Sequence, residues 1–403
     1  MLPWKRIEPM ANQSFVRLVN ERRVLTLLRL DGPTTRAAIS RKLALTRSSI
    51  SNVIDSLLSR ELVREDATPE NTTGTTHSGR PGVNVSLNPH GAYLLGVEID
   101  LNILRLAVMD LAGNIVVKKT VAVSTDRSED FVSEITAFVD HLKTSRTPVK
   151  AIGVTVPGLV QLDGFVVHLP VLGWKNVNLG SEIEQRTQLP VLVENNTNAA
   201  AFGEVYGFSG EKRGFILYLK LGVGCGGAAV MNGRLIRGAT GTATEFGHMR
   251  ISASGPITCS CGRSGCLETY VNLDALARAW APDATMTLTE KIALPARIYA
   301  EAERKNKAAR SAIDVLRQPL LTGLISLTNL FNPNEIVLGG IMRPLLSLIV
   351  GDLQQGLRAG VIPGMSVPRL TLSTSKEYEC AVGAAAIAHH QSFDVSNIEV
   401  EAD

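Results

Sequence analysis

Apolar residues recur at helical spacing in three segments near the start of the chain. The first segment covers residues 14–29 and stops at Asp31-Gly32-Pro33, a sequence that favours a turn. The second covers Thr35 to Leu43. The third follows Thr46, whose hydroxyl can cap a helix, and continues to about residue 60. The pattern predicts three consecutive helices, each with one buried face.

Two short segments after the third helix have the composition of strands, residues 62–65 and 83–87. The polar loop between them, residues 66–82, is longer than a hairpin requires and ends in Gly79-Arg80-Pro81-Gly82. An arginine on such a slim, rigid backbone suits a narrow minor groove. Three helices and a hairpin predict a winged helix-turn-helix over residues 1–88. A small helical bundle for protein contacts is the alternative.

The third predicted helix has a polar face opposite its apolar residues. Short polar groups and a guanidinium on this face suit the major groove, where they can reach base edges. The first 90 residues are also basic, with 13 Lys and Arg against 8 Asp and Glu, whereas the whole chain has a net charge of only +3. We therefore expect contacts with operator double-stranded DNA from Arg36, Thr46, Arg47, Ser48, Ser49, Ser51, Asn52 and Arg80.

From Pro89 onwards strands alternate with helices, which is typical of a mixed α/β domain. Strands are expected at residues 93–97, 103–109 and 115–117, and a related run of strand, loop, strand and tight turn returns at residues 215–236. The repetition predicts an internally duplicated fold with a ligand cleft between two lobes. We expect the lobes at residues 89–210 and 211–403, with the C-terminal helix packed back on the first lobe.

The composition is that of an ordinary globular protein, with 45% hydrophobic and 20% charged residues. We find no apolar run of about 18 residues, the length that a membrane helix needs. The first ten residues also lack the apolar stretch of a signal peptide. We therefore expect a cytoplasmic protein without membrane contact.

Three of the five cysteines, Cys259, Cys261 and Cys266, lie within eight positions of one another. Such clustering in a reducing compartment indicates a metal site more than a disulfide. His248 lies eleven residues before the cluster, so one imidazole and three thiolates complete a tetrahedral set for Zn²⁺. Four protein ligands leave no open position, and the predicted zinc is therefore structural. Three free thiols in a loop are the alternative.

Several motifs of the chain resemble those of the ROK family of sugar kinases and sugar-responsive repressors. They are Gly153-Val-Thr-Val-Pro-Gly158, Glu194-Asn-Asn-Thr-Asn-Ala-Ala200, the glycine-rich residues 222–227, Glu245-Phe-Gly-His248, and the cysteine cluster that ends in Leu267-Glu268. The resemblance covers nearly the whole chain. It implies a duplicated actin-like, ribonuclease-H-like α/β domain of the ATPase type with two lobes, and the N-terminal extension is similar to that of the repressor branch.

The resemblance also implies a sugar site. In family members with sugar bound, the residues that hold the hydroxyls correspond here to Asn195, Asn196, Glu245, His248 and Glu268. Carboxylates and amides can donate to or accept from neighbouring hydroxyls, and a metal-bound imidazole keeps its second nitrogen for a ligand.

Two departures from the kinase pattern favour a regulator that is not an enzyme. The kinases have an aspartate where this chain has Asn196, and an amide is no base at neutral pH. Loss of a positioned general base costs about 10²- to 10⁴-fold in rate. The first phosphate loop of the kinases is replaced by Glu98-Ile-Asp-Leu-Asn102, in which the Asp100 carboxylate would repel phosphate.

The sequence therefore predicts a repressor whose operator affinity changes when a sugar or sugar derivative binds. A helix-turn-helix protein of this kind is expected to act as a homodimer or homotetramer on pseudo-palindromic DNA. Two alternatives stay open at this stage: an active sugar kinase with an added DNA-binding domain, and a repressor controlled by a protein partner.

Overall fold

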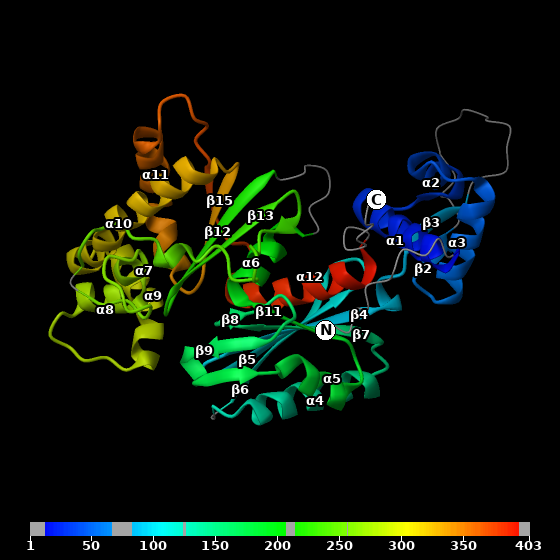
Figure 1. The fold of residues 1–403 in the computed structure, drawn as a ribbon, viewed down its shortest axis with the longest axis horizontal. Helices are drawn as coiled ribbons and strands as arrows, with labels where there is room; N and C mark the ends of the chain where they lie inside the picture. Colours follow the sequence, from blue (N-terminus) through cyan, green and yellow to red (C-terminus); the bar gives the residue numbers. More distant parts are fainter. Residues whose placement is uncertain (1–12, 67–82, 124–125, 207–213, 256, 395–403) are drawn as a thin grey trace. The chain divides into compact units, whose positions relative to one another are not determined.

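The computed structural model describes residues 13–66, 83–123, 126–206, 214–255 and 257–394. Contacts divide the chain into two compact units (Figure 1). The first unit comprises residues 1–194, 206–211 and 381–403, and the second comprises residues 195–205 and 212–380. The three domains expected from the sequence, with boundaries near residues 88 and 210, remain a prediction.

The N-terminal part of the first unit contains three helices and a small antiparallel sheet. The elements are α1 (Gln13–Asp31), α2 (Arg36–Leu43), α3 (Arg47–Ser59), β1 (Thr34–Thr35), β2 (Val63–Asp66) and β3 (Asn84–Leu87), with sheet order β1-β3-β2. The three predicted helices are thus confirmed. Thr35 and Thr46 cap α2 and α3, each accepting a hydrogen bond from a backbone N–H in the first turn. The interior face of α3 buries Ile50, Val53 and Leu57.

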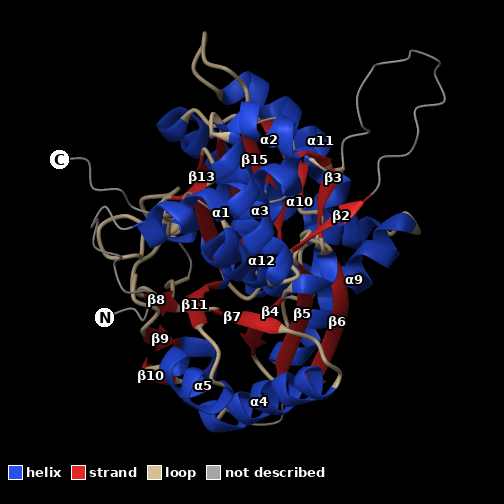
Figure 2. Cartoon of the chain, turned by 90° about the vertical axis from the view of Figure 1, so that its right-hand side faces the viewer, coloured by secondary structure: helices blue, strands red, loops and turns tan. Residues whose placement is uncertain are grey.

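The rest of the first unit is built on a five-stranded sheet of order β11-β7-β4-β5-β6. Its strands are β4 (Tyr93–Asp100), β5 (Ile103–Asp110), β6 (Ile115–Ala122), β7 (Val149–Val156) and β11 (Val191–Asn195). A smaller sheet contains β8 (Leu159–Val160), β9 (Val166–Leu169) and β10 (Trp174–Val177), and short 3₁₀ turns cover Pro89–Gly91 and Pro170–Leu172. The helices α4 (Ser128–Thr144) and α5 (Leu179–Thr187) cover one face of the five-stranded sheet (Figure 2).

The C-terminal helix α12 (Glu379–Phe393) packs on the other face of this sheet. Its approach is close because two glycines of the sheet have no side chain. A Cβ atom on Gly96 would lie 1.9 Å from the carbonyl oxygen of Ala381, and one on Gly153 would lie 2.1 Å from that of Ala384. Small residues on both elements therefore let α12 lie against β4 and β7.

The second unit contains another five-stranded sheet, of order β14-β13-β12-β15-β16. Its strands are β12 (Phe215–Leu221), β13 (Cys225–Met231), β14 (Arg234–Leu235), β15 (Glu335–Gly339) and β16 (Arg369–Leu372). Its helices are α6 (Asn196–Val205), α7 (Glu268–Val271), α8 (Leu273–Trp280), α9 (Leu288–Glu303), α10 (Lys307–Phe331) and α11 (Arg343–Gly360), with 3₁₀ turns at Phe246–His248 and Lys376–Tyr378.

The two large sheets repeat one topology. In each, three sequential antiparallel strands occupy one side, and two later strands lie beyond the first of the three, which pairs in parallel with the nearer of them. The internal duplication predicted from the strand pattern is therefore confirmed. Among the described residues, no helix combines the length and hydropathy needed to cross a bilayer.

Candidate functional site

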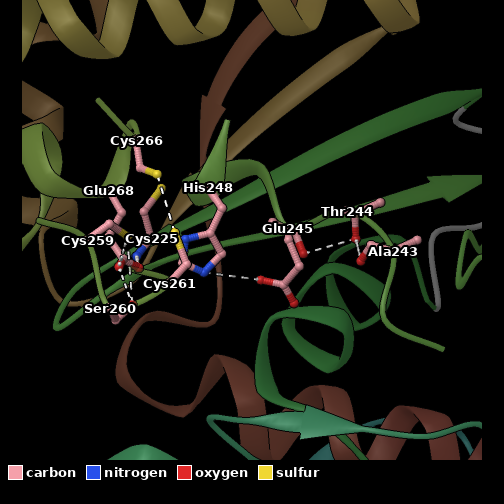
Figure 3. A network of polar contacts seen from close by, with 11 residues as sticks. Cys225, Ala243, Thr244, Glu245, His248, Cys259, Ser260, Cys261, Cys266 and Glu268 are labelled. Carbon is pink, nitrogen blue, oxygen red and sulfur yellow. Dashed lines mark hydrogen bonds and ion pairs between the residues drawn. The ribbon is translucent and has the colours of Figure 1, made fainter. Parts of the chain in front are cut away.

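The four predicted metal ligands come together in the second unit. The ligand atoms of His248, Cys259, Cys261 and Cys266 all lie within 4.8 Å of one another (Figure 3). His248 Nδ1 lies 3.3 Å from Cys259 Sγ, and the sulfur atoms of Cys261 and Cys266 lie 3.7 Å apart. The imidazole thus faces the cysteines through Nδ1, and the set could hold one metal ion.

Glycines and two short β-bridges shape the cysteine loop. Arg250 pairs with Cys266, and Thr258 pairs with Ser264. Gly265 has a φ of +81°, and a Cβ atom there would lie 2.1 Å from the carbonyl oxygen of Ser252. A glycine is therefore required at this turn.

The protonation of the thiols depends on whether a cation is bound. Burial raises the pKa of Cys266 to about 12 and also raises that of Cys259, while a backbone hydrogen bond from Arg263 lowers the pKa of Cys261. Cys266 is fully buried and Cys259 is 4% exposed. Without a cation the buried pair would keep its protons, whereas a bound metal ion would deprotonate the thiols and neutralise the resulting charge.

Two carboxylates of the predicted sugar site lie beside this cluster. His248 Nε2, the nitrogen that faces away from the cysteines, lies 4.0 Å from Glu245 Oε2. Burial raises the pKa of Glu245, and the charge of His248 lowers it to a smaller extent. Glu268 Oε2 accepts a hydrogen bond of 2.9 Å from the Cys225 backbone N–H, and its Oε1 accepts one of 3.2 Å from Ser260 Oγ. His248 thus connects the cysteines to a carboxylate, and Glu268 joins the glycine-rich loop to the cysteine loop.

The two predicted amides lie where β11 ends and α6 begins. Asn195 Oδ1 accepts hydrogen bonds of 2.8 and 3.2 Å from the backbone N–H groups of Thr197 and Asn198, so this side chain caps α6. Asn196 is 6% exposed, and its Oδ1 accepts a bond of 3.3 Å from Thr197 Oγ1. All five predicted sugar residues belong to the second unit.

The predicted DNA-contact residues differ in their exposure to solvent. Arg47, Ser48 and Asn52 are exposed on α3, while Ser49 and Ser51 are half-buried there. The Thr46 hydroxyl is used as the helix cap, with Oγ1 3.1 Å from the Ser49 backbone nitrogen. Arg80 lies outside the described residues.

Arg36 is held within the N-terminal domain by two carboxylates. Its Nη2 lies 2.8 Å from Asp55 Oδ1, and its Nε lies 2.7 Å from Glu65 Oε1. These acceptors come from α3 and β2, and the sequence did not indicate them. The guanidinium therefore ties three elements together, in addition to any contact with DNA.

The family of the chain follows from comparison with known proteins. The model of the ROK family matches residues 94–391, which is most of the chain. The chain belongs to the ROK family. It is 27% identical to the xylose repressor of Bacillus spizizenii, over 96% of this chain and 98% of that protein.

Two solved ROK structures resemble this one. A ROK family transcriptional regulator, described as a homolog of the Escherichia coli MLC protein, has a TM-score of 0.77 and 27% identity over 94% of this chain and 97% of that chain. A ROK family glucokinase from Streptomyces griseus, in complex with glucose and AMPPNP, has a TM-score of 0.64 and 28% identity over 74% of this chain and 99% of its own. The chain therefore has the actin-like sugar-kinase fold of the ROK family, as the motifs implied.

Proposed function

We propose that this ROK protein is a sugar-responsive transcriptional repressor. The observation that carries the proposal is the extent of similarity: the xylose repressor is matched over 96% of the chain, whereas the glucokinase is matched over 74%. The ROK family match begins at residue 94, and the segment before it contains the three N-terminal helices and the small sheet. In our proposal these elements, within residues 1–88, form a winged helix-turn-helix that binds operator DNA with the exposed polar residues of α3.

Our proposed effector is an aldose, bound by Asn195, Asn196, Glu245, His248 and Glu268. The names and ligands of its relatives, a xylose repressor and a glucokinase with glucose, make D-xylose and D-glucose the first sugars to test. Both amides and both carboxylates can form hydrogen bonds with vicinal hydroxyls. Glu245 faces His248 Nε2, so a hydroxyl between them would meet one donor and one acceptor.

We further propose that His248, Cys259, Cys261 and Cys266 hold a structural Zn²⁺. One nitrogen and three sulfur donors match the preference of zinc, and the four ligands close its coordination sphere. When bound, the metal would fix the cysteine loop and hold the His248 ring so that Nε2 is directed at Glu245. The expected assembly is a homodimer or homotetramer, because helix-turn-helix proteins usually bind paired half-sites.

A titration tests the proposed function directly. We expect the protein to bind its own upstream DNA about 10³-fold or more tightly than a scrambled duplex, as specific operators are bound. D-xylose or D-glucose should change that affinity in wild-type protein, measured by fluorescence anisotropy at fixed salt.

The same titration includes one site variant and one control. Glu245→Gln should keep operator binding but lose most of the response to sugar, since the neutral amide has one acceptor oxygen in place of two and cannot form the stronger hydrogen bond of a charged carboxylate. Glu303→Gln, an exposed position at the end of α9, removes the same charge and should respond like wild type. Equal affinity for both duplexes would end the repressor proposal, and a sugar response that survives in full in Glu245→Gln would remove Glu245 from the site.

We also propose that the protein does not transfer phosphate. Asn196 offers no base for the sugar hydroxyl, and Asp100 is the last residue of β4, where its Oδ1 accepts a hydrogen bond of 2.8 Å from the Leu101 N–H. A coupled ATP-turnover assay with D-glucose and D-xylose should therefore give no phosphosugar above background. Turnover that disappears in Asn196→Ala would identify an active kinase with an added DNA-binding domain.

A further inference from the structure

We propose that Tyr206 is the positioning residue that couples α6, at whose start the sugar amides lie, to the DNA-binding domain through Arg29 and His389. This inference rests on the proposed function, because it assigns the path by which a sugar would change operator affinity. Arg29 belongs to α1, and His389 belongs to α12.

The aromatic ring of Tyr206 contacts α1 of the N-terminal domain. The Arg29 guanidinium carbon lies 4.5 Å from the centre of the Tyr206 ring, a cation–π distance. The Arg29 side chain is only 9% exposed, and Nη2 lies 3.4 Å from Asp394 Oδ2. A buried guanidinium stacked on a ring loses much of its stabilisation when the ring moves, because water does not replace the contact.

The hydroxyl of Tyr206 contacts α12. Tyr206 Oη lies 2.5 Å from His389 Nδ1, and His389 Nε2 lies 2.9 Å from the carbonyl oxygen of Leu111. Since a carbonyl only accepts, Nε2 carries the proton, and Tyr206 donates to Nδ1. Burial lowers the pKa of His389 to about 4, so the ring stays neutral and this arrangement holds at neutral pH.

The surroundings of Tyr206 form the joint between the N-terminal domain and the rest of the first unit. Arg22 Nη1 donates to the Asp394 carbonyl oxygen at 3.1 Å, so two of the arginines of α1, Arg22 and Arg29, contact Asp394. Phe393 and Leu111 pack in the same apolar cluster as Leu25 of α1. A small pocket lined by Leu25, Arg29, Tyr206, His389, Phe393 and Asp394 lies at this joint. The placement of α1 therefore depends on where Tyr206 and the end of α12 lie.

The helix α6 leads from the predicted sugar amides to Tyr206. It begins at Asn196, ends at Val205, and Tyr206 is the next residue. Near its end, Glu204 accepts hydrogen bonds from the Thr374 backbone N–H at 2.7 Å and from Thr374 Oγ1 at 3.0 Å, so the helix is held in the second unit at both ends. Ten residues of α-helix are about 15 Å long and stiff, so a displacement at Asn196 would reach Tyr206 with little loss.

Three variants separate coupling from binding. Tyr206→Leu removes the ring and the hydroxyl, Tyr206→Phe removes only the hydroxyl, and Tyr299→Leu in α9 is the control for loss of a partly buried tyrosine. For each we would measure the operator Kd with and without saturating D-xylose or D-glucose, and the sugar Kd without DNA. Hydrogen exchange of the α1 amides without sugar provides a second readout.

In wild type we expect sugar to change the operator Kd by about 5- to 150-fold, the usual range of allosteric coupling. In Tyr206→Leu that change should fall to within about twofold, while the sugar Kd stays within about threefold of wild type, since the sugar residues are intact. Tyr206→Phe should lie between the two, and Tyr299→Leu should respond like wild type. Of the three variants, only Tyr206→Leu should show faster hydrogen exchange of the α1 amides than wild type.

The outcomes distinguish the coupling from the function on which it rests. Full sugar response in Tyr206→Leu, or α1 exchange equal to that of wild type, would overturn the coupling proposal. If wild-type protein bound neither sugar, the sugar proposal would fail on its own, and the exchange measurement would still decide whether Tyr206 holds α1.

Discussion

Replacement of Cys266 by serine is expected to remove zinc from the protein and to lower its free energy of unfolding by about 4 kcal/mol or more, the range in which loss of a metal stands out among point mutations. Cys266 is fully buried and pairs with Arg250 in a β-bridge, so its sulfur is fixed at the centre of the loop. A serine hydroxyl is a poor zinc ligand, and three donors bind the ion far more weakly than four. Atomic emission for zinc and urea unfolding measure the two effects.

The matched control is Cys225→Ser. Cys225 is also buried, lies close to Glu268, and is not among the four clustered ligands. The Cys225→Ser variant should retain one zinc per chain. Its free energy of unfolding should fall only by the smaller amount that a polar atom in an apolar site costs. If Cys266→Ser kept its zinc, or if both variants were equally destabilised, the proposed metal site would be wrong.

The sequence predicted those features of the fold that depend on neighbours along the chain. A threonine directly before an amphipathic segment is a signal for the start of a helix, and Thr35 and Thr46 do cap α2 and α3. The repeated strand pattern predicted two sheets of one topology, and the structure has them. The metal cluster was predictable for a similar reason: three cysteines within eight positions can hardly lie far apart.

Features that depend on distant residues could not be predicted in this way. Arg36 has the same exposed, basic character in the sequence as Arg47, yet it meets Asp55 and Glu65, which lie 19 and 29 positions later. No local pattern specifies that pairing, since it requires α2, α3 and β2 to be assembled first.

The joint at Tyr206 had no signal in the sequence either. Its partners Arg29 and His389 come from opposite ends of the chain. An isolated tyrosine after a helix is not distinctive, and α12 is apolar on most of its surface, so its sequence does not indicate which side meets the sheet. The close approach of Gly96 and Gly153 to this helix shows which side meets the sheet.

The second large effect is expected from substitution of exposed residues on α3. Arg47 and Asn52 are exposed on this helix, whereas Ile50, Val53 and Ile54 hold its other face in the core of the N-terminal domain. Arginine reads guanine and asparagine reads adenine by paired hydrogen bonds in the major groove. Substitution of both exposed residues should therefore leave the fold intact and remove the contacts that read the bases.

We expect the double variant Arg47→Ala with Asn52→Ala to bind its operator about 30- to 10⁴-fold more weakly, since each base-reading pair contributes about 1–3 kcal/mol. Binding to a scrambled duplex should weaken far less. The slope of log affinity against log salt concentration should decrease by no more than the contribution of one phosphate contact. Arg310→Ala, an exposed arginine on α10, removes the same charge and should leave operator affinity nearly unchanged. An equal loss on both duplexes would mean that α3 contacts the DNA backbone alone, and that the bases are read elsewhere in the N-terminal domain.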